Sequence, residues 1–217
     1  MVDRMTAAPL ELAEELRDRG VVAVVRGPSA RAAVVAARAL ARGGITAIEL
    51  TFTVPSAEEA IAELAGEEGL LVGAGTVLDA DQARAAVAAG ARYLVAPNLD
   101  PAVVEAAREL GAPLLPGALT PTEVAAAMRV APVVKLFPAG LGGPAHLGAL
   151  RGPFPGLRAV PTGGVSADNL ADWLDAGALA VGAGSDLCPA EAVAAGDEDA
   201  LRARAERYAA ALRAARS

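Results

Sequence analysis

"VVAVVRGPSARAAVVAARALARGGITAIELT", residues 21–51, contains two apolar runs separated by an alanine-rich segment. The runs at 21–26 and 46–51 are short and contain β-branched residues and leucine, which is typical of buried strands. The segment between them, 29–44, begins with a serine and ends with two glycines, the residue types that start and stop helices. A strand, a helix and a second strand in this order predict an α/β fold built on parallel strands.

The same alternation continues along the chain. Apolar runs expected to form strands lie at 21–26, 46–51, 70–75, 92–97, 113–117, 132–137, 157–163 and 179–184. Helical segments such as 166–178 lie between most of them, and a last helix is expected at about 198–214. Eight strands alternating with helices predict one domain, residues 1–217, folded as a single (β/α)8 TIM barrel with an extra N-terminal helix. An open, doubly wound sheet of eight strands is the alternative.

Composition narrows the classes of function. Apolar residues make up 54% of the chain, yet no long uncharged run predicts a membrane span. The first twenty residues mix acids with arginines and have no apolar export core, so we expect a cytoplasmic protein. The net charge of −7 argues against nucleic acid as a partner. A single cysteine, Cys188, and a single histidine, His146, predict no internal disulfide and no protein-bound metal. The high apolar content favours a homo-oligomer.

The only lysine of the chain, Lys135, lies in "APVVKLFPAG", residues 131–140. All other basic residues that are not histidine are arginine, so a positive charge alone does not explain this choice. An amine can lose its proton and attack a carbonyl, whereas a guanidinium group stays charged. Burial favours the neutral amine, which is how imine-forming lysines arise. Lys135 is therefore a candidate nucleophile, and an ordinary surface lysine is the alternative.

Glu49 is the acidic residue best placed to act with Lys135. Function in a barrel gathers at the carboxyl ends of the strands, and both residues lie near such ends. Strand alternation places Glu49 on one face with Thr51 and Thr53, opposite Ile48. If Lys135 also faces inward, the carboxylate and the amine meet across the barrel mouth. A purely structural buried ion pair is the alternative.

Two glycine clusters follow the last two expected strands, "PTGGVSADN" at 161–169 and "VGAGSDL" at 181–187. Exposed backbone N–H groups at such turns bind phosphate without a basic side chain, and barrels commonly bind phosphate at these two loops. Tight turns alone are the alternative for each cluster. A third cluster, "GAGTV" at 73–77, allows a ligand to approach the backbone and offers the Thr76 hydroxyl.

Taken together, these segments resemble the KDPG/KHG aldolase family, the class I aldolases that cleave 2-keto-3-deoxy-6-phosphogluconate. The resemblance rests on segments in the same order along nearly the whole chain: "GGITAIELT", "GAGTV", "PLLPGALTPTE", "VKLFPA", "GPFP", "VPTGGV" and "VGAGS". "KLFPA", preceded by "IELT" and followed by "PTGG", is the specific part. The resemblance implies a barrel, usually a homotrimer, that needs no metal or other cofactor.

The resemblance also implies roles for individual residues. Lys135 corresponds to the Schiff-base lysine and Glu49 to the proton acceptor and donor. The remaining implied contacts are with pyruvate, at Thr76 and Pro97, and with phosphate, at Gly163, Gly164 and Ser185. The implied reaction yields pyruvate and glyceraldehyde 3-phosphate, the cleavage step of the Entner–Doudoroff pathway. A phosphosugar-binding barrel isomerase or synthase remains the alternative, as do a non-catalytic phosphosugar-binding barrel and an aldolase for the galactonate epimer or for 4-hydroxy-2-oxoglutarate.

One position departs from the family pattern. Many members carry an arginine two residues after the threonine of "ELT", where it meets the substrate carboxylate, but here that residue is Thr53. An unpaired carboxylate in an apolar site is unfavourable by several kcal/mol, on the order of a lost charged hydrogen bond. Arg26, at the end of the first expected strand, is the nearest candidate cation. We expect Arg26 to supply part of the missing charge, at the carboxylate or along the sugar toward the phosphate.

Overall fold

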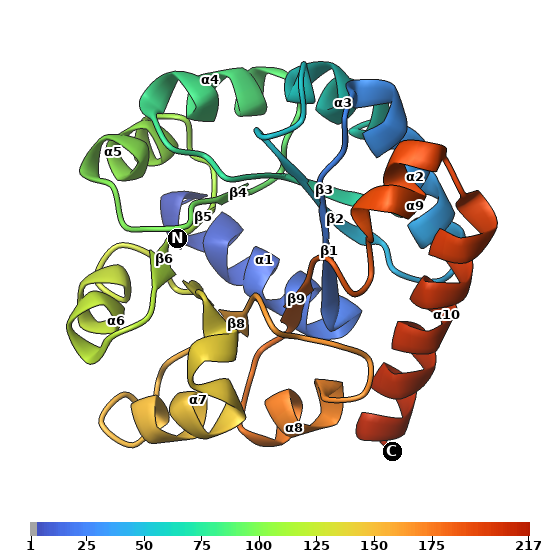
Figure 1. Ribbon diagram of the computed structural model, residues 1–217. Coiled ribbons are helices and arrows are strands. Elements are labelled where there is room, and N and C mark those ends of the chain that lie inside the picture. The colour runs from blue at the N-terminus through green and yellow to red at the C-terminus, as the bar shows by residue number, and fades with distance from the viewer. Residues whose placement is uncertain (1–3) are drawn as a thin grey trace.

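The computed structural model describes residues 4–217, with side chains from Pro9 onward, and strands alternate with helices along it (Figure 1). The strands are β1 (Val21–Val25), β2 (Ala47–Thr51), β3 (Leu71–Gly75), β4 (Leu94–Val95), β5 (Leu114–Leu115), β6 (Gly117–Ala118), β7 (Val134–Leu136), β8 (Ala159–Pro161) and β9 (Val181–Ala183). The helices are α1 (Arg4–Arg19), α2 (Ala30–Arg42), α3 (Ala57–Leu64), α4 (Ala80–Ala88), α5 (Pro101–Glu109), α6 (Pro121–Ala127), α7 (Gly143–Arg151), α8 (Leu170–Asp175), α9 (Ala190–Ala195) and α10 (Glu198–Ala215), with a 3-10 turn, η1 (Ala139–Leu141). The expected N-terminal helix and last helix are confirmed as α1 and α10.

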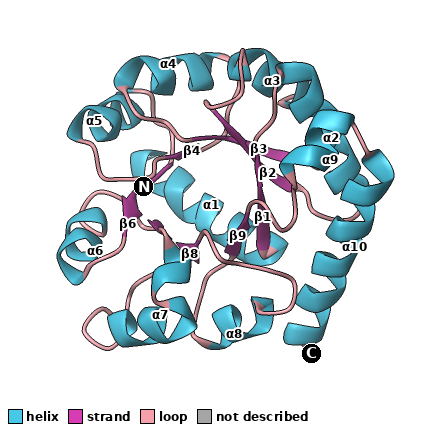
Figure 2. Ribbon diagram, viewed as in Figure 1, coloured by secondary structure: helices cyan, strands magenta, loops and turns pink. Residues whose placement is uncertain are grey.

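The strands pair in parallel in two hydrogen-bonded sets. One set has the order β5-β4-β3-β2-β1-β9, and the other has the order β6-β7-β8. A single bridge between Thr162 and Gly182 joins the two sets beside β8 and β9. Helices α2 to α10 lie outside the curved row of strands, as the colours of Figure 2 show. The predicted α/β fold with parallel strands is confirmed.

The fifth expected strand, 113–117, is interrupted rather than continuous. It forms two short pieces, β5 and β6, with Pro116 between them. Proline has no backbone N–H to donate to a ladder, which explains the break. On one side of it Leu115 pairs with Val95, and on the other side Gly117 pairs with Lys135. The chain therefore changes its partner set at this proline.

Two separate apolar clusters stabilise the strands. The larger lies between the strands and the outer helices and includes Ile48, Leu50 and Trp173. The smaller includes α1 and the amino ends of the strands: Leu12, Ala13, Leu16, Val22, Ala47, Leu71, Tyr93, Val95, Leu115, Val133, Val160, Leu179 and Ala180. Because its members belong to α1 and to alternate strand positions, helix α1 covers the inner strand face at the amino ends. The opposite, carboxyl ends remain available for a site.

The inner face of β2 changes from apolar to polar along the strand. On β2 the inner positions run from Ala47 through Glu49 to Thr51, whereas Ile48 and Leu50 pack outward against the helices. The predicted alternation of this strand is therefore confirmed. The polar residues Glu49 and Thr51 follow this apolar layer toward the carboxyl end of β2.

Helix starts follow the sequence signals closely. Ser29 accepts a hydrogen bond from the backbone N–H of Ala32 at the start of α2, and Asp100 does the same for Ala102 and Val103 at α5. Helix α8 is shorter than the expected segment 166–178, since it begins after Asn169. These caps satisfy N–H groups that a helix cannot pair internally.

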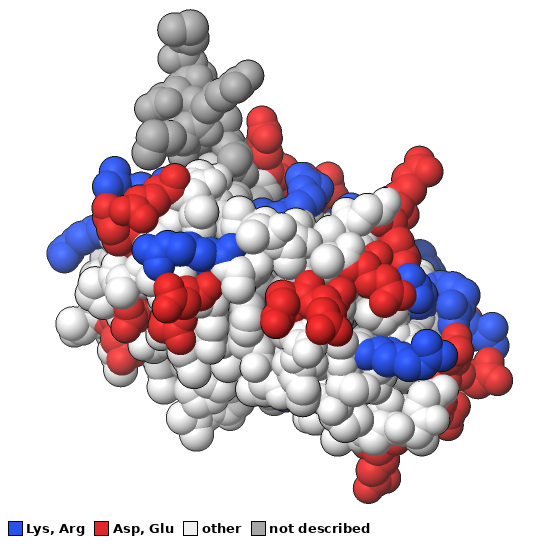
Figure 3. All heavy atoms as spheres, turned by 90° about the horizontal axis from the view of Figure 1, so that it is seen from above, with Lys and Arg blue, Asp and Glu red and all other residues white. Residues whose placement is uncertain are grey.

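The outer surface carries mixed charge. Acidic and arginine side chains are interspersed on the face drawn in Figure 3. Arg38, for example, pairs with Glu63 at 2.9 Å and with Glu67 at 2.7 Å. Exposed pairs of this kind contribute at most about 1 kcal/mol, so the apolar clusters dominate stability. None of the helices between residues 4 and 217 is both long and apolar enough to cross a membrane.

Candidate active site

Lys135 and Glu49 meet at the inner face of the strands. Lys135 Nζ lies 3.3 Å from Glu49 Oε1, although the two residues are 86 positions apart. Each residue is only 3% exposed. They come from β7 and β2, which belong to the two different hydrogen-bonded sets. The pair therefore spans the interior of the fold, as the strand alternation predicts.

Glycine makes room for the Glu49 carboxylate on the neighbouring strand. In the parallel register of β2 and β3, Thr51 pairs with Gly75. A Cβ at Gly75 would lie 2.1 Å from Glu49 Oε1, far inside van der Waals contact. Only glycine at this inner position lets the carboxylate lie flat against β3 and reach the lysine.

A second glycine on β3 makes room for an aromatic side chain beneath the pair. A Cβ at Gly73 would lie 2.3 Å from the ring of Tyr93. The Tyr93 hydroxyl donates a hydrogen bond of 3.1 Å to the backbone oxygen of Ile48. Burial, and secondly the negative charge of Glu49, raise the pKa of Tyr93 well above its usual value. Tyr93 therefore stays a neutral hydrogen-bond donor below the carboxylate.

Phe137 connects the lysine to a small pocket at the ends of β8 and β9. Its ring centroid lies 5.5 Å from Lys135 Nζ, and Phe137 directly follows the end of β7. The pocket has a volume of about 140 Å³. It is lined by Val24, Arg26, Phe137, Thr162, Gly163, Gly164, Val165, Gly184 and Ser185. One side chain thus borders both the lysine and the glycine loops.

The two loop glycines lie in a conformation that other residues rarely adopt. Gly163 has a φ of 86° and Gly164 a φ of 80°. A Cβ at Gly164 would also lie 2.7 Å from the Cα of Gly140, in the turn after β7. Gly163 and Gly164 line the pocket without side chains, so their backbone borders it. Backbone N–H groups exposed at such turns favour anions.

Arg26 is exposed and borders this pocket rather than the lysine. It lines the pocket together with Ser185 and the glycines. A Cβ at Gly184 would lie 4.0 Å from the Arg26 guanidinium. A cation thus stands beside the backbone groups of both loops, where a bound anion gains from it.

The threonines lie at the ends of β2 and β3. Thr51 donates a hydrogen bond of 3.1 Å to the backbone oxygen of Val25, and its hydroxyl lies 2.7 Å from that of the exposed Thr53. Thr76 has a φ of 55°, which is strained for a β-branched residue. Strain of this kind is concentrated at functional sites, where the surrounding fold holds it.

Pro97 lies at the end of β4, half-buried, with its carbonyl against the next strand. A Cβ at Gly117 would lie 2.1 Å from that carbonyl oxygen. Thr53, Thr76 and Pro97 do not line the pocket that holds Arg26. The predicted residues therefore form two groups, one at the loops after β8 and β9 and one at the ends of β2, β3 and β4.

The single cysteine and the single histidine lie outside these two groups of predicted site residues. Burial raises the pKa of the Cys188 thiol to about 12, so it packs as a small apolar group, as expected. His146 lies in α7, and its Nε2 is 2.8 Å from the backbone oxygen of Leu119. Among the residues that the structure describes, no three His, Cys, Asp or Glu side chains are grouped as metal ligands.

Sequence reasoning missed several residues around the site. Gly140 lies against Gly164 in the loop after β8, and Gly75 leaves the space that the Glu49 carboxylate occupies. Asp186 and Tyr208 form hydrogen bonds with each other behind the loops. Tyr208 is one of only two tyrosines, which is the one signal that could have singled it out.

A buried lysine beside a carboxylate, in a parallel α/β fold with a pocket bordered by glycine loops, fits the class of enzymes that use an amine as nucleophile. Residues 12–203 match the family described as KDPG and KHG aldolase. The chain belongs to this family, which confirms the resemblance recognised in the sequence.

Individual relatives agree with this assignment. The chain is 42% identical to the 2-dehydro-3-deoxy-phosphogluconate aldolase of Treponema pallidum over 187 residues, 85% of this chain and 89% of the relative. It is 37% identical to the probable 2-dehydro-3-deoxy-6-phosphogalactonate aldolase of Rhizobium meliloti over 190 residues, 86% of each chain.

A solved structure is similar over most of the length. The KDPG aldolase of Legionella pneumophila, with pyruvate captured at low pH as a covalent carbinolamine intermediate, superposes with a TM-score of 0.80 at 31% identity. The match covers 86% of this chain and 92% of that chain. Sequence and fold therefore point to the same family.

Proposed function

We propose that this chain is a class I aldolase that cleaves 2-keto-3-deoxy-6-phosphogluconate into pyruvate and glyceraldehyde 3-phosphate. The observation that carries the proposal is the buried 3.3 Å contact between Lys135 Nζ and Glu49 Oε1. Membership of the KDPG and KHG aldolase family supports the reaction, and the carbinolamine in the Legionella relative supports a covalent amine mechanism.

Lys135 acts as the nucleophile. Its neutral amine attacks the C2 ketone of the substrate, and loss of water from the carbinolamine gives a protonated imine. Glu49, directly or through a water molecule, takes the proton of the C4 hydroxyl, and the C3–C4 bond breaks as its electron pair enters the imine. Glyceraldehyde 3-phosphate leaves. Protonation of the enamine at C3 and hydrolysis release pyruvate and return the amine.

The pairing with Glu49 opposes the first step, since a carboxylate favours the charged form of a lysine. Lys135 is buried, and its Nζ also lies 5.5 Å from the centroid of the Phe137 ring. Substrate entry would separate the two groups and leave the amine in an apolar surrounding. Glu49 then remains as the base for the C4 hydroxyl.

The substrate lies with its phosphate at the pocket after β8 and β9 in this proposal. Backbone groups of Gly163 and Gly164, with Ser185, bind the phosphate, and Arg26 adds the cation. The position of Arg26 in that pocket supports its role at the phosphate end rather than at the carboxylate. Thr76 and Pro97 contact the pyruvate end, and Thr53 offers a neutral hydroxyl to the carboxylate.

The remaining expectations, on domain, barrel closure, assembly, location and partners, are also proposals. We infer one domain in which β1 to β9 close into a (β/α)8 TIM barrel, with β5 and β6 as one interrupted strand. The bridge between Thr162 and Gly182 and the short link at Pro116 support closure. We also infer a cytoplasmic homotrimer without a resident cofactor, acting on a small phosphorylated keto acid and not on nucleic acid or a membrane.

Trapping with borohydride tests the proposal. Incubation with pyruvate and borohydride should give a stable adduct on Lys135, located by mass spectrometry of peptides, and turnover should release pyruvate from the phosphogluconate substrate. A structural ion pair or a phosphosugar isomerase would form no adduct. Assays with the gluconate and galactonate epimers, and with 4-hydroxy-2-oxoglutarate, then define the substrate, because relatives with both sugar names resemble this chain.

A further inference from the structure

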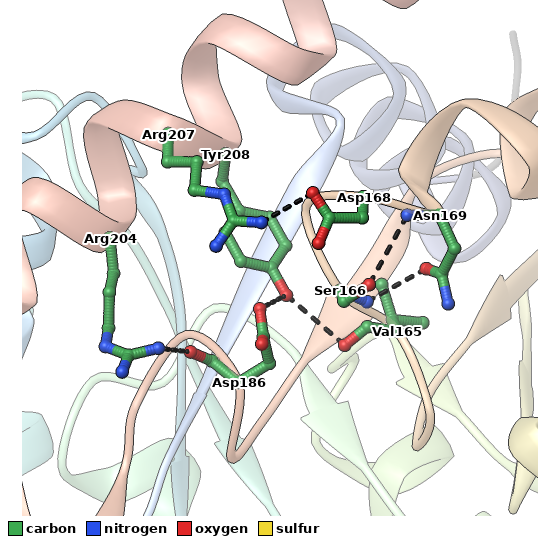
Figure 4. Close-up of polar contacts among 8 residues, drawn as sticks. All are labelled: Val165, Ser166, Asp168, Asn169, Asp186, Arg204, Arg207 and Tyr208. Carbon is green, nitrogen blue, oxygen red and sulfur yellow. Dashed lines mark hydrogen bonds and ion pairs between the residues drawn. The ribbon is translucent and has the colours of Figure 1, made fainter.

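A polar network connects the last helix to both glycine loops (Figure 4). We call it the α10 network. Its members are Arg204, Arg207 and Tyr208 of α10, Val165, Ser166, Asp168 and Asn169 after β8, and Asp186 after β9. Arg207 and Tyr208 lie three and four residues after Arg204, about one helical turn further on, so both lie on the same side of the helix as Arg204. That face points at the two loops in Figure 4.

Tyr208 lies at the centre of the α10 network. Its hydroxyl contacts the backbone oxygen of Val165 at 3.2 Å and Asp186 Oδ2 at 2.8 Å. Val165 directly follows Gly164, and Asp186 directly follows Ser185. One hydroxyl therefore joins the residues adjacent to both proposed phosphate-binding elements. Tyr208 itself is only 1% exposed and does not line the pocket.

Other members hold the same two loops. Arg204 donates a hydrogen bond of 2.7 Å to the backbone oxygen of Asp186. Arg207 forms an ion pair with Asp168. Asn169 donates a bond of 2.9 Å from Nδ2 to the backbone oxygen of Gly164. Each loop is thus fixed at its backbone, beside the groups that face the pocket.

We infer that Tyr208 is a positioning residue, which sets the spacing of the loops after β8 and β9 so that their backbone N–H groups converge on one phosphate. The inference rests on the proposed function only in naming a phosphate as the anion. Gly163 and Gly164 have no side chains by which the fold could hold them, and glycine is the most flexible residue. Backbone donors bind an anion well only when they are held in place beforehand. The hydroxyl between the loops supplies that restraint.

The chemistry of the hydroxyl suits this role. Two acceptors share its single hydrogen, so the restraint requires the neutral phenol. Burial, and secondly the hydrogen bond and charge of Asp186, raise the pKa of Tyr208 above its usual value. The hydrogen is therefore retained at neutral pH. The restraint also depends on Asp186 as an acceptor.

Tyr208→Phe tests the inference, because it keeps the ring and removes only the hydroxyl. We expect the inhibition constant of inorganic phosphate, and the KM for phosphorylated substrate, to rise about three- to tenfold, the range for one lost hydrogen bond. The rate of pyruvate trapping at Lys135 should stay within about twofold, since pyruvate carries no phosphate. Tyr93→Phe is the matched control, because it removes the other buried tyrosine hydroxyl, which donates to Ile48 and not to the loops. It should leave the phosphate constant unchanged.

Substitutions at Asp186 separate positioning from electrostatics. By charge alone, loss of an acid beside the pocket would tighten phosphate binding in every variant. Asp186→Asn keeps an acceptor for Tyr208, so its phosphate constant should equal or fall below that of the unmodified protein. Asp186→Ala removes the acceptor, and we expect its phosphate constant to rise despite the lost charge. The phosphate constant changes in opposite directions in Asp186→Asn and Asp186→Ala only if the contact between Tyr208 and Asp186 positions the loops.

Phosphate binding tests the inference on Tyr208 without any need for the cleavage reaction. Phosphate binding is also measured as a shift in Tm with inorganic phosphate, which needs no turnover. A folded Tyr208→Phe variant with an unchanged phosphate constant would overturn the inference, as would tighter phosphate binding in Asp186→Ala. If Tyr208→Phe does not fold, the Asp186 pair alone decides. Absence of a pyruvate adduct in the unmodified protein would instead contradict the proposed function.

Discussion

Gly75→Ala should lower kcat because it displaces Glu49, although the Glu49 carboxylate itself is not altered. The alanine methyl group would be placed 2.1 Å from Glu49 Oε1 and 2.5 Å from its Cγ. Gly75 does not have a positive φ, so alanine can adopt its backbone conformation without strain. The effect of the substitution is therefore steric and is directed at one side chain.

The size of the effect follows from the displacement. Ordinary contact begins at about 3.4 Å, so the carboxylate oxygen must move by about 1.3 Å from its position 3.3 Å from Lys135 Nζ. A misplacement of about 1 Å at a reacting group lowers the rate on the order of 10²-fold. Crowding the interior should also destabilise the fold by about 1–3 kcal/mol. Pyruvate should still be trapped, because Lys135 is not altered.

Steady-state cleavage coupled to reduction of the released pyruvate measures kcat, and borohydride trapping measures the amine separately. Thermal unfolding establishes that each variant is folded at the assay temperature. Gly148→Ala is the control, because a Cβ there meets nothing within 4 Å and alanine favours the helix α7 in which it lies. Its kcat should equal that of the unmodified protein.

A double variant makes the reasoning refutable. If Gly75 acts only through Glu49, Gly75→Ala combined with Glu49→Gln should be no slower than Glu49→Gln alone. If the loss of kcat in the double variant equals the product of the losses in the two single variants, Gly75 matters for a reason other than the position of Glu49. An unchanged kcat in Gly75→Ala would show that the position of Glu49 tolerates this shift.

Five further variants test the remaining roles. Lys135→Arg should fold but lose both turnover and the pyruvate adduct, so an adduct elsewhere than at the N-terminal amine would contradict its role. Glu49→Gln should lower the cleavage rate on the order of 10²–10⁴-fold, as expected for a lost acid–base group, while part of the trapping remains; an unfolded protein would indicate a structural ion pair instead. Gly164→Asp should raise KM for phosphorylated substrate but preserve pyruvate trapping, since it introduces a negative charge and a Cβ 2.7 Å from the Cα of residue 140. Arg26→Met should lower kcat/KM about tenfold or more. Thr53→Ala should lower kcat/KM only as far as the loss of one hydrogen bond explains, and the reverse order would show that this site needs no cation.

The alternation of strands and the inner placement of Lys135 and Glu49 were predictable from local sequence. A strand has a period of two, so Glu49 had to share a face with Thr51, and the carboxyl ends of parallel strands had to meet. Lys135 also faces inward, since its Nζ lies 3.3 Å from Glu49 Oε1. These inferences need only neighbours along the chain.

Contacts that depend on the register between strands were not predictable. The steric need for glycine at position 75 arises from its pairing with Thr51, and the break at Pro116 arises where the partner strand changes. Tyr208 meets Val165 across 43 positions of sequence, and no periodic pattern marks such a pair. The residues that hold the site were therefore harder to find than those proposed to react.

The place of β1 between β2 and β9 has a consequence for synthesis of the chain. Val21 pairs with Val181, 160 positions later, and not only with its sequence neighbour β2. At about 5–20 residues per second, one edge of β1 waits roughly 8–32 s on the ribosome for its partner. An unpaired edge in an apolar strand invites pairing with other chains during that interval. Production of this protein should therefore depend on chaperones and on slow, cool expression.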